Sequence, residues 1–485
     1  MAKRLIVYAL IALLAWPAGA ADPEDLPDIG SPADALLTRG KAEAIGRGVL
    51  RQMRDAGYVL EDPEIAEYID SIGHRISATA HEGDHEFTFF VVSDDAINAF
   101  ALPGGYVGVN TGLIAATRSE SELAGVLSHE VAHVTQNHIA RRAAATGRNS
   151  ILASAAVLAA ILMGATGAAS GDAVEAAILG AQGMAVQEQI NYTRANEHEA
   201  DRVGLQFLSE AGFDPMGMPS FFEVLSRLGG SGSPGNRVPE ILLTHPLSSA
   251  RISETTERAE RIKAGVVEES PLYPLMQARI RVLGARSADE ALDYYRNQTE
   301  GEFHAAAPEV RYGYALALMR AGRYADAVPI LYSLRQEDET IVAYHSALGQ
   351  AEVMAGRSPE GLLTLRQAMR LFPRNVPLTV RYGEALLRTG QFEEAHTVLL
   401  DLFNNVAPTP AQIRLIANAA DAAGQRAEAL YYMSEYHLLT GHLPQAVEQL
   451  KLALRVPELQ SWQRARFEAR LAELEPYLKK QRRGS

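Results

Sequence analysis

The second half of the chain repeats itself every 34 residues, and this period constrains the fold more than any other feature. The repeated turns all centre on glycine: Ala321-Gly322-Arg323, Ala355-Gly356-Arg357, Thr389-Gly390-Gln391 and Ala423-Gly424-Gln425. Small residues recur in register at two further positions, namely Ala315, Gly349, Gly383 and Ala417, and Ala327, Gly361, Ala395 and Ala429. One such unit cannot bury its apolar face alone, so we expect stacked helix pairs that form a curved solenoid.

This pattern resembles the tetratricopeptide repeat, which pairs two helices in each unit. We place the array at residues 308–475, with a further half-unit at Thr440-Gly441-His442. Residues 266–307 are expected to form a helical connector or a degenerate first repeat, and the basic residues 476–485 a frayed tail. The concave surface of such a solenoid predicts recognition of protein partners.

The first half contains the sequence His129-Glu130-Val131-Ala132-His133, which predicts a catalytic metal site. Residues four apart lie on one face of a helix, so His129 and His133 can direct ring nitrogens at one ion. Ser119 or Ser121 is a candidate N-cap for that helix. A bound zinc ion lowers the pKa of its water toward ~7, and Glu130 can take the proton as water attacks a peptide carbonyl. The alternative is a chance pair of histidines on an ordinary amphipathic helix.

A second helical stretch opens at Asn196-Glu197-His198-Glu199-Ala200-Asp201 and offers a third ligand. Catalytic zinc usually has three protein ligands and one open position. Glu197 and Asp201 share a helix face, so Glu197 can bind the ion while Asp201 accepts the other ring N–H of a ligand histidine. Glu199 points elsewhere on the helix. The alternative for these acidic residues is a solvated helix start, where the helix dipole favours carboxylates.

Four elements in family order resemble the zinc metallopeptidase family of the HtpX heat-shock protease and the CAAX prenyl protease, over residues 35–265. They are residues 98–105 (Asn98-Ala99-Phe100-Ala101-Leu102-Pro103-Gly104-Gly105), the His129–His133 motif, Glu197-x-x-Ala200-Asp201 and Thr244-His245-Pro246. The resemblance implies one zinc ion per chain, held by His129, His133 and Glu197, with Glu130 as the catalytic base. The expected fold class is mostly α with a small β-sheet: a zincin-like (gluzincin) domain followed by the repeat solenoid.

His245 follows a flexible, glycine-rich loop at residues 229–235, and three roles are open for it. It can occupy the open zinc position and gate the site, stabilise the oxyanion, or only start the turn at Pro246. Arg251 can orient substrate or pair with a structural carboxylate.

Three short runs rich in β-branched and aromatic residues precede the motif helix: Phe87–Val92, Asn98–Leu102 and Tyr106–Val109. They predict a small sheet whose edge strand can pair with an extended substrate, although a purely structural role is equally open. Residues 151–186 are rich in alanine and are expected to form a packed helical hairpin, because Ala, Gly, Ser and Thr gain little on transfer to lipid. A peripheral contact with a membrane or a partner is the alternative.

The N-terminus has the order of a secretory signal peptide at residues 1–20: Lys3 and Arg4, an apolar run from Leu5 to Trp16, and then small residues. The mature chain is expected to begin near Ala21, with residues 21–34 as its N-terminal segment. An uncleaved anchor is the alternative, but the apolar run is short for a membrane span. The chain has no cysteine for disulfides or for lipidation. Because the signal is of the bacterial type and no later membrane span is expected, we expect a periplasmic protein that is soluble or peripheral at the outer membrane.

The formal net charge of −14 excludes nucleic acid as a partner, because phosphates need a basic patch. No Walker or dinucleotide glycine fingerprint occurs, so zinc is the only cofactor expected. The resemblance extends to periplasmic family members with a repeat array, and it implies quality control of outer-membrane β-barrel proteins. Substrates are then unfolded or misassembled envelope proteins, and the repeats contact the barrel assembly machinery. The alternative is a chaperone or assembly adaptor with little proteolysis at rest.

Overall fold

The computed structural model describes residues 37–80, 85–146, 183–230, 238–263, 265, 267, 269–298, 305–457 and 459–484. The predicted signal peptide at 1–20, the segment at 21–34 and nearly all of the Ala-rich stretch at 151–186 lie outside the described residues. Within the described ranges, no helix combines the length and the apolar character that a membrane crossing requires.

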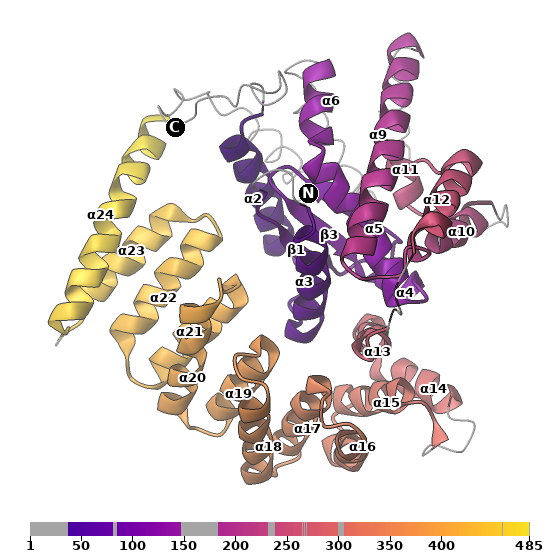
Figure 1. Cartoon of the computed structure of the whole chain (residues 1–485). Coiled ribbons are helices and arrows are strands. Elements are labelled where there is room, and N and C mark those ends of the chain that lie inside the picture. The colour runs from indigo at the N-terminus through magenta and orange to yellow at the C-terminus, as the bar shows by residue number, and fades with distance from the viewer. Residues whose placement is uncertain are drawn as a thin grey trace. The chain divides into compact units, whose positions relative to one another are not determined.

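The described chain is mostly helical with one small sheet, which confirms the expected fold class (Figure 1). It divides into two compact units. Unit 1 contains the described residues up to Leu60 and from Ile69 to Ser270, and unit 2 contains Glu61–Tyr68 and the residues from Pro271 onward. The helices of unit 1 are α2 (Arg39–Asp55), α4 (Thr111–Ala116), α5 (Glu120–Thr135), α6 (His138–Thr146), α9 (Gly183–Glu210), α10 (Gly217–Gly230), α11 (Ile241–Thr244) and α12 (Ser249–Arg261).

The sheet of unit 1 has three strands in the order β1-β3-β2: β1 (Thr88–Val92), β2 (Ala99–Leu102) and β3 (Tyr106–Asn110). Each strand lies where the sequence predicted one. Strand β3 pairs in parallel with β1 and antiparallel with β2. The turn between β2 and β3 needs glycine, because Gly105 has a φ of 83° and an added Cβ would overlap the carbonyl oxygen of Glu86. Helix α5 packs against β2 and β3.

Nearly all side chains of helix α5 are buried. It begins after the N-cap Ser119, whose side-chain oxygen accepts a hydrogen bond from the Glu122 N–H at 3.1 Å. Helix α9 approaches it closely at Gly204, where an added Cβ would lie 2.9 Å from the carbonyl oxygen of Ser128 and 3.1 Å from the Cα of His129. The missing side chain at Gly204 therefore lets the two helices bring their functional faces together.

We expect Gly204→Ala to destabilise the chain by about 1–3 kcal/mol, because the added methyl group overpacks the contact between α9 and α5. Gly48→Ala in α2 is the matched control, since a Cβ there would meet nothing within 4 Å. Alanine is favoured over glycine inside a helix by about 0.5–1 kcal/mol, so the control should be neutral or stabilising. Thermal unfolding followed by circular dichroism measures both. An unfolding midpoint of Gly204→Ala equal to that of the wild type would contradict this prediction, because it would show that α5 and α9 accommodate the methyl group without loss of stability.

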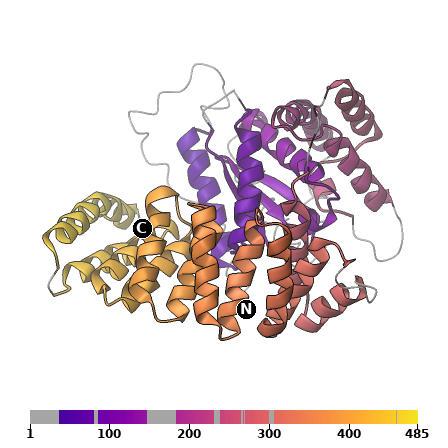
Figure 2. The same cartoon turned by 60° about the horizontal axis from the view of Figure 1, so that its bottom comes forward.

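Unit 2 is built from helix pairs in chain order, which confirms the predicted repeat solenoid (Figure 2). Its helices are α13 (Leu272–Gly284), α14 (Ala288–Gln298), α15 (Pro308–Arg320), α16 (Tyr324–Glu337), α17 (Val342–Met354), α18 (Ser358–Leu371), α19 (Val376–Arg388), α20 (Phe392–Asn405), α21 (Pro410–Ala422), α22 (Arg426–Leu439), α23 (Leu443–Leu454) and α24 (Ser461–Gly484). The stretch expected as a connector or degenerate repeat thus contains α13 and α14. Phe467 and Leu474 anchor helix α24 in a hydrophobic cluster with α23, and the helix extends to Gly484, into the region that the sequence predicted as a frayed tail.

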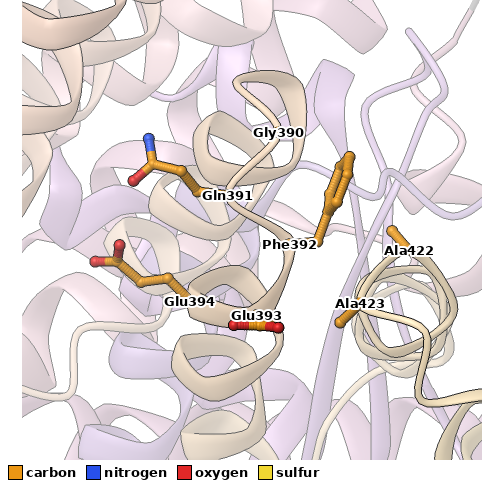
Figure 3. A pocket seen from close by; sticks show the side chains of 7 residues that line it. All are labelled: Gly390, Gln391, Phe392, Glu393, Glu394, Ala422 and Ala423. Carbon is orange, nitrogen blue, oxygen red and sulfur yellow. The ribbon is translucent and has the colours of Figure 1, made fainter.

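The repeated glycines end the first helix of each pair in a left-handed conformation, with φ values of 75° at Gly322, 81° at Gly356, 80° at Gly390 and 75° at Gly424. One of these turns borders a surface pocket (Figure 3). Its lining residues belong to two consecutive repeats: Gly390, Gln391, Phe392, Glu393, Glu394, Ala422 and Ala423. Phe392 is 39% exposed there, so an aromatic ring lies open at this pocket beside the side chains of Glu393 and Glu394.

Helix α3 (Pro63–Ser77) begins in the segment of unit 2 and continues into unit 1. In unit 2 the carboxylates of Asp62 and Glu64 form ion pairs with Arg279, each at 2.8–3.0 Å, and Glu64 also pairs with Arg381 at 2.8 Å. Burial raises the pKa of Glu64, but the charges of the two arginines outweigh burial and hold the pKa far below its ordinary range. This buried cluster explains why Glu61–Tyr68 joins unit 2, a division that departs from the predicted domain bounds at 35–265 and 308–475.

Candidate metal centre

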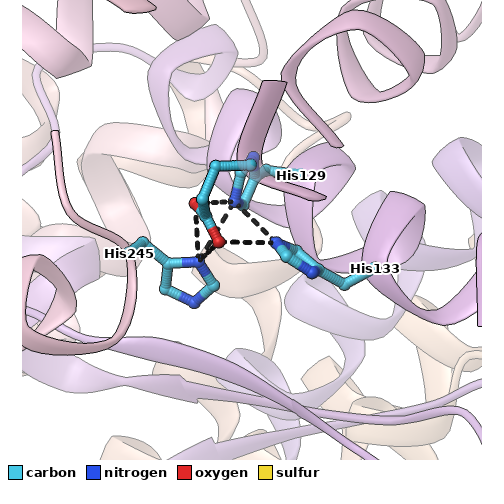
Figure 4. A group of neighbouring side chains, drawn as sticks. His129, His133 and His245 are labelled. Carbon is cyan, nitrogen blue, oxygen red and sulfur yellow. Dashed lines mark hydrogen bonds and ion pairs between the residues drawn. The ribbon is translucent and has the colours of Figure 1, made fainter. Parts of the chain in front are cut away.

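The two helices that meet at Gly204 carry the predicted ligands to one point. Each of His129, His133, Glu197 and His245 offers one ligand atom, and these atoms all lie within 4.8 Å of one another (Figure 4). His129 and His133 come from successive turns of α5, and Glu197 comes from α9. The structure therefore brings together the three residues that the sequence named as metal ligands, and it adds His245 to them.

The spacing of these atoms fits a tetrahedral zinc ion. The Nε2 atoms of His129 and His133 are 3.0 Å apart, and they lie 3.4 Å and 3.5 Å from the oxygens of Glu197. Ligands bound to zinc at about 2.0 Å in tetrahedral geometry are separated by about 3.3 Å. Two imidazoles and a carboxylate are also a common catalytic ligand set for zinc.

The electrostatics of the cluster favour a cation. Burial lowers the pKa of His129, but the carboxylates of Asp201 and Glu197 outweigh it and raise the pKa to about 10. Burial and the neighbouring charge of His129 lower the pKa of His133 well below its ordinary value. The carboxylates thus attract positive charge into a buried space, and a divalent ion would satisfy them with each histidine as a neutral ligand.

Glu130 lies at the same cluster and is almost completely buried, with 1% of its surface exposed. Its Oε1 atom makes no hydrogen bond with any part of the chain that the structure describes, and it lies 3.5 Å from Nε2 of His245. A buried carboxylate oxygen without a partner is costly in a structural role. The position is suited to a group that accepts a proton from a bound water.

Asp201 occupies the place that the sequence predicted for it beside a ligand histidine. Its carboxylate lies 3.0 Å from Nδ1 of His129. The Arg251 guanidinium binds the same carboxylate through two N–H groups, each at 2.7 Å, and lies 3.0 Å from Glu197. Burial raises the pKa of Asp201, but the hydrogen bonds from Arg251 and His129 outweigh it and lower the pKa. Of the two roles open for Arg251, the structure thus shows the pairing with carboxylates.

His245 ends the short helix α11 and turns its ring into the ligand cluster. Its Nδ1 atom lies 3.1 Å from the Glu197 carboxylate and 3.2 Å from Nε2 of His129. Burial lowers the pKa of His245, but the charges of Glu197 and Glu130 outweigh it and raise the pKa. Arg251 fixes the adjacent backbone by donating to the Pro246 carbonyl oxygen at 2.8 Å.

His138 is a site residue that sequence reasoning missed. Its Nδ1 atom lies 2.9 Å from Nδ1 of His133, and its Nε2 atom lies 3.2 Å from the Glu199 carboxylate. Arg141 donates to the same carboxylate at 2.9 Å. The available signal was a third histidine five residues after His133. The sequence also placed Glu199 away from the metal, and the structure places it against His138.

Comparison with known proteins agrees with this site. Residues 63–259 match the model of peptidase family M48. The chain is 35% identical to the putative beta-barrel assembly-enhancing protease of Vibrio cholerae serotype O1, over 97% of this chain and 96% of that protein. It is 33% identical to the beta-barrel assembly-enhancing protease of Escherichia coli K12, over the same shares of the two chains. It is 31% identical to the mitochondrial metalloendopeptidase OMA1 of Arabidopsis thaliana, over 40% of this chain and 36% of that protein.

The OMA1 match is confined to a part of each chain, whereas the two bacterial relatives match from end to end, repeats included. The family model, the two bacterial relatives and the buried cluster of candidate metal ligands lead to the same assignment. The chain belongs to peptidase family M48 and is a metalloendopeptidase.

Proposed function

We propose that this chain is a zinc-dependent endopeptidase of the periplasm that degrades misassembled outer-membrane β-barrel proteins and aids their assembly. The observation that carries the proposal is the buried cluster of His129, His133 and Glu197 beside the Glu130 carboxylate, whose Oε1 atom accepts no hydrogen bond from the described residues. The names of the two bacterial relatives, which match over 97% of this chain, support the choice of substrate. The signal-like order of residues 1–20 supports the periplasm.

In this proposal His129, His133 and Glu197 hold the metal. A bound zinc ion supplies Lewis acidity and lowers the pKa of a water molecule to about 7. Glu130 accepts the proton of the attacking water at its free oxygen and passes it to the departing amine. Asp201, anchored by Arg251, keeps the ring of His129 oriented, so that its Nε2 atom faces Glu197 and would be free to bind the metal.

The position of His245 favours a second description of the same protein: an assembly adaptor with little proteolysis at rest. Its ring nitrogen has the separation from Glu197 and His129 that a fourth ligand of one ion would have. A histidine in that position closes the site to water until the segment at Pro246 moves. The repeats then provide docking, and the pocket at Phe392 supports contact with a protein partner such as the barrel assembly machinery.

A substrate trap tests the proposed function. The full chain with Glu130→Gln keeps every metal ligand but lacks the base, so it should retain substrates that the wild type cleaves. Cross-linking in the bacterial envelope, followed by mass spectrometry, should enrich unassembled β-barrel proteins. The control is the double variant Glu130→Gln with Glu197→Ala, which lacks a metal ligand. Equal recovery of barrel proteins by both variants would contradict capture at the metal site.

A further inference from the structure

The ring of His133 contacts a second histidine, His138, on the side turned away from the ligand cluster. His138 is the first residue of α6, and only 4% of its surface is exposed. Its Nδ1 atom lies 2.9 Å from the Nδ1 atom of His133, which is the ring nitrogen turned away from the ligand cluster. The ligand His129 has a carboxylate, Asp201, in the corresponding place. The two metal-binding rings are thus supported by different chemical groups.

The tautomers of this pair follow from the requirement that His133 binds the metal through Nε2. His133 presents Nε2 to the cluster, 3.0 Å from Nε2 of His129, so that atom must be bare to bind a metal. The single proton of a neutral His133 therefore lies on Nδ1 and is donated to His138. His138 then accepts at its Nδ1 and carries its own proton on Nε2. That proton points to the Glu199 carboxylate, 3.2 Å away.

Glu199 completes this series of hydrogen bonds, because an ionised carboxylate can only accept hydrogen bonds. Arg141 donates to it at 2.9 Å. Glu199 therefore accepts hydrogen bonds from both Arg141 and His138. The resulting hydrogen-bond relay runs from His133 through His138 to Glu199, and each of its hydrogen bonds has one donor and one acceptor.

The backbone is arranged for this contact. Helix α5 ends at Thr135, and Asn137 then adopts a φ of 52°, a left-handed conformation that few residues other than glycine and asparagine tolerate. The N–H of Asn137 donates to the Val134 carbonyl oxygen at 2.9 Å, which fixes this turn. The chain therefore reverses tightly between α5 and α6, and His138 faces the last turn of the helix that carries His133.

We propose that His138 is a positioning residue for the metal ligand His133, and that Glu199 fixes its tautomer. The proposal rests on the zinc site described above and deepens it. The relay keeps the proton of His133 on Nδ1 and holds the plane of its ring, so that Nε2 stays free for the ion. Loss of such a support typically weakens metal binding by about 10 to 100-fold.

The test is the zinc dissociation constant of the full chain, measured by competition with a chelator of known affinity. His138→Leu removes the acceptor and should weaken zinc binding by about 10 to 100-fold. His138→Asn keeps an acceptor close to the position of Nδ1 and should restore the affinity to within about threefold of the wild type. His198→Ala is the matched control, because this histidine pairs with Glu254 at 2.9 Å, and no hydrogen bond or ion pair among the described residues joins its ring to a metal ligand. It should bind zinc as the wild type does.

The visible absorption spectrum of the cobalt-substituted chain provides a second readout, since it reports the geometry of the ligands. His138→Leu should alter this spectrum, and His138→Asn should restore it. Should His138→Leu fail to fold, Glu199→Ala cuts the same relay at its more exposed end and should weaken zinc binding by about 10-fold.

Wild-type zinc affinity in both His138→Leu and Glu199→Ala would overturn the proposal, as would equal loss in His138→Leu and His138→Asn. Either result would mean that the His138 ring only packs α6 against α9 and does not support His133. Failure of the wild type itself to bind zinc would instead contradict the proposed function, so the two failures are distinguishable.

Discussion

Replacing Glu130 with glutamine is expected to lower peptide hydrolysis by about 10²–10⁴-fold while the chain keeps one zinc ion. The amide has the size of the carboxylate but cannot accept a proton. Glu130 is not among the clustered ligand atoms, so its replacement should leave metal binding intact. Turnover of an unstructured substrate such as casein, measured together with zinc content, gives both numbers.

The matched control is Glu210→Gln, the same chemical change on the exposed end of α9, where Glu210 contacts only the side chain of Gln206 among the described hydrogen bonds. It should retain wild-type turnover. Hydrolysis by Glu130→Gln within about threefold of the wild type would exclude Glu130 as the base, because general bases contribute far more.

Replacing His245 with alanine is expected to raise proteolysis without loss of zinc. The Nδ1 atom of His245 lies 3.1 Å from Glu197 and 3.2 Å from His129, separations that match two ligands of one ion. If the site is open in about 10% of molecules or fewer, removing the ring should raise turnover by about 10-fold or more. Thr244→Val is the control, since it changes the neighbouring residue of α11 and keeps the imidazole.

A decrease in proteolysis by His245→Ala would instead identify His245 as an oxyanion donor. As an oxyanion donor, the ring would stabilise the transition state, and its removal would lower turnover by about 10²-fold with zinc retained. That outcome in the casein assay would contradict gating. An increase in His245→Ala that Thr244→Val reproduces would assign the effect to loosening of the segment.

The parts of the fold that depend on local period were predictable from the sequence. The spacing of His129 and His133, the helix face shared by Glu197 and Asp201, and the strands before α5 all follow from short-range geometry. The repeats were predictable for the same reason, because small residues recur in register over several units.

The parts that depend on contacts between distant segments were not predictable. Glu61–Tyr68 joins unit 2 because Asp62 pairs with Arg279, a partner 217 residues away in the chain. The contact of His138 with His133 requires the left-handed turn at Asn137, which no periodic pattern indicates. Arg251 was noticed in the sequence, but its choice of Asp201 over substrate depends on how α12 meets α9.

The zinc content of the purified full chain tests the central claim most directly. After dialysis against a weak chelator, the wild type and Glu130→Gln should each hold one zinc ion per chain. His133→Ala and Glu197→Ala should hold almost none, because each loses one of three protein ligands. Full zinc occupancy in Glu197→Ala, in protein that remains folded, would contradict the site formed by His129, His133 and Glu197.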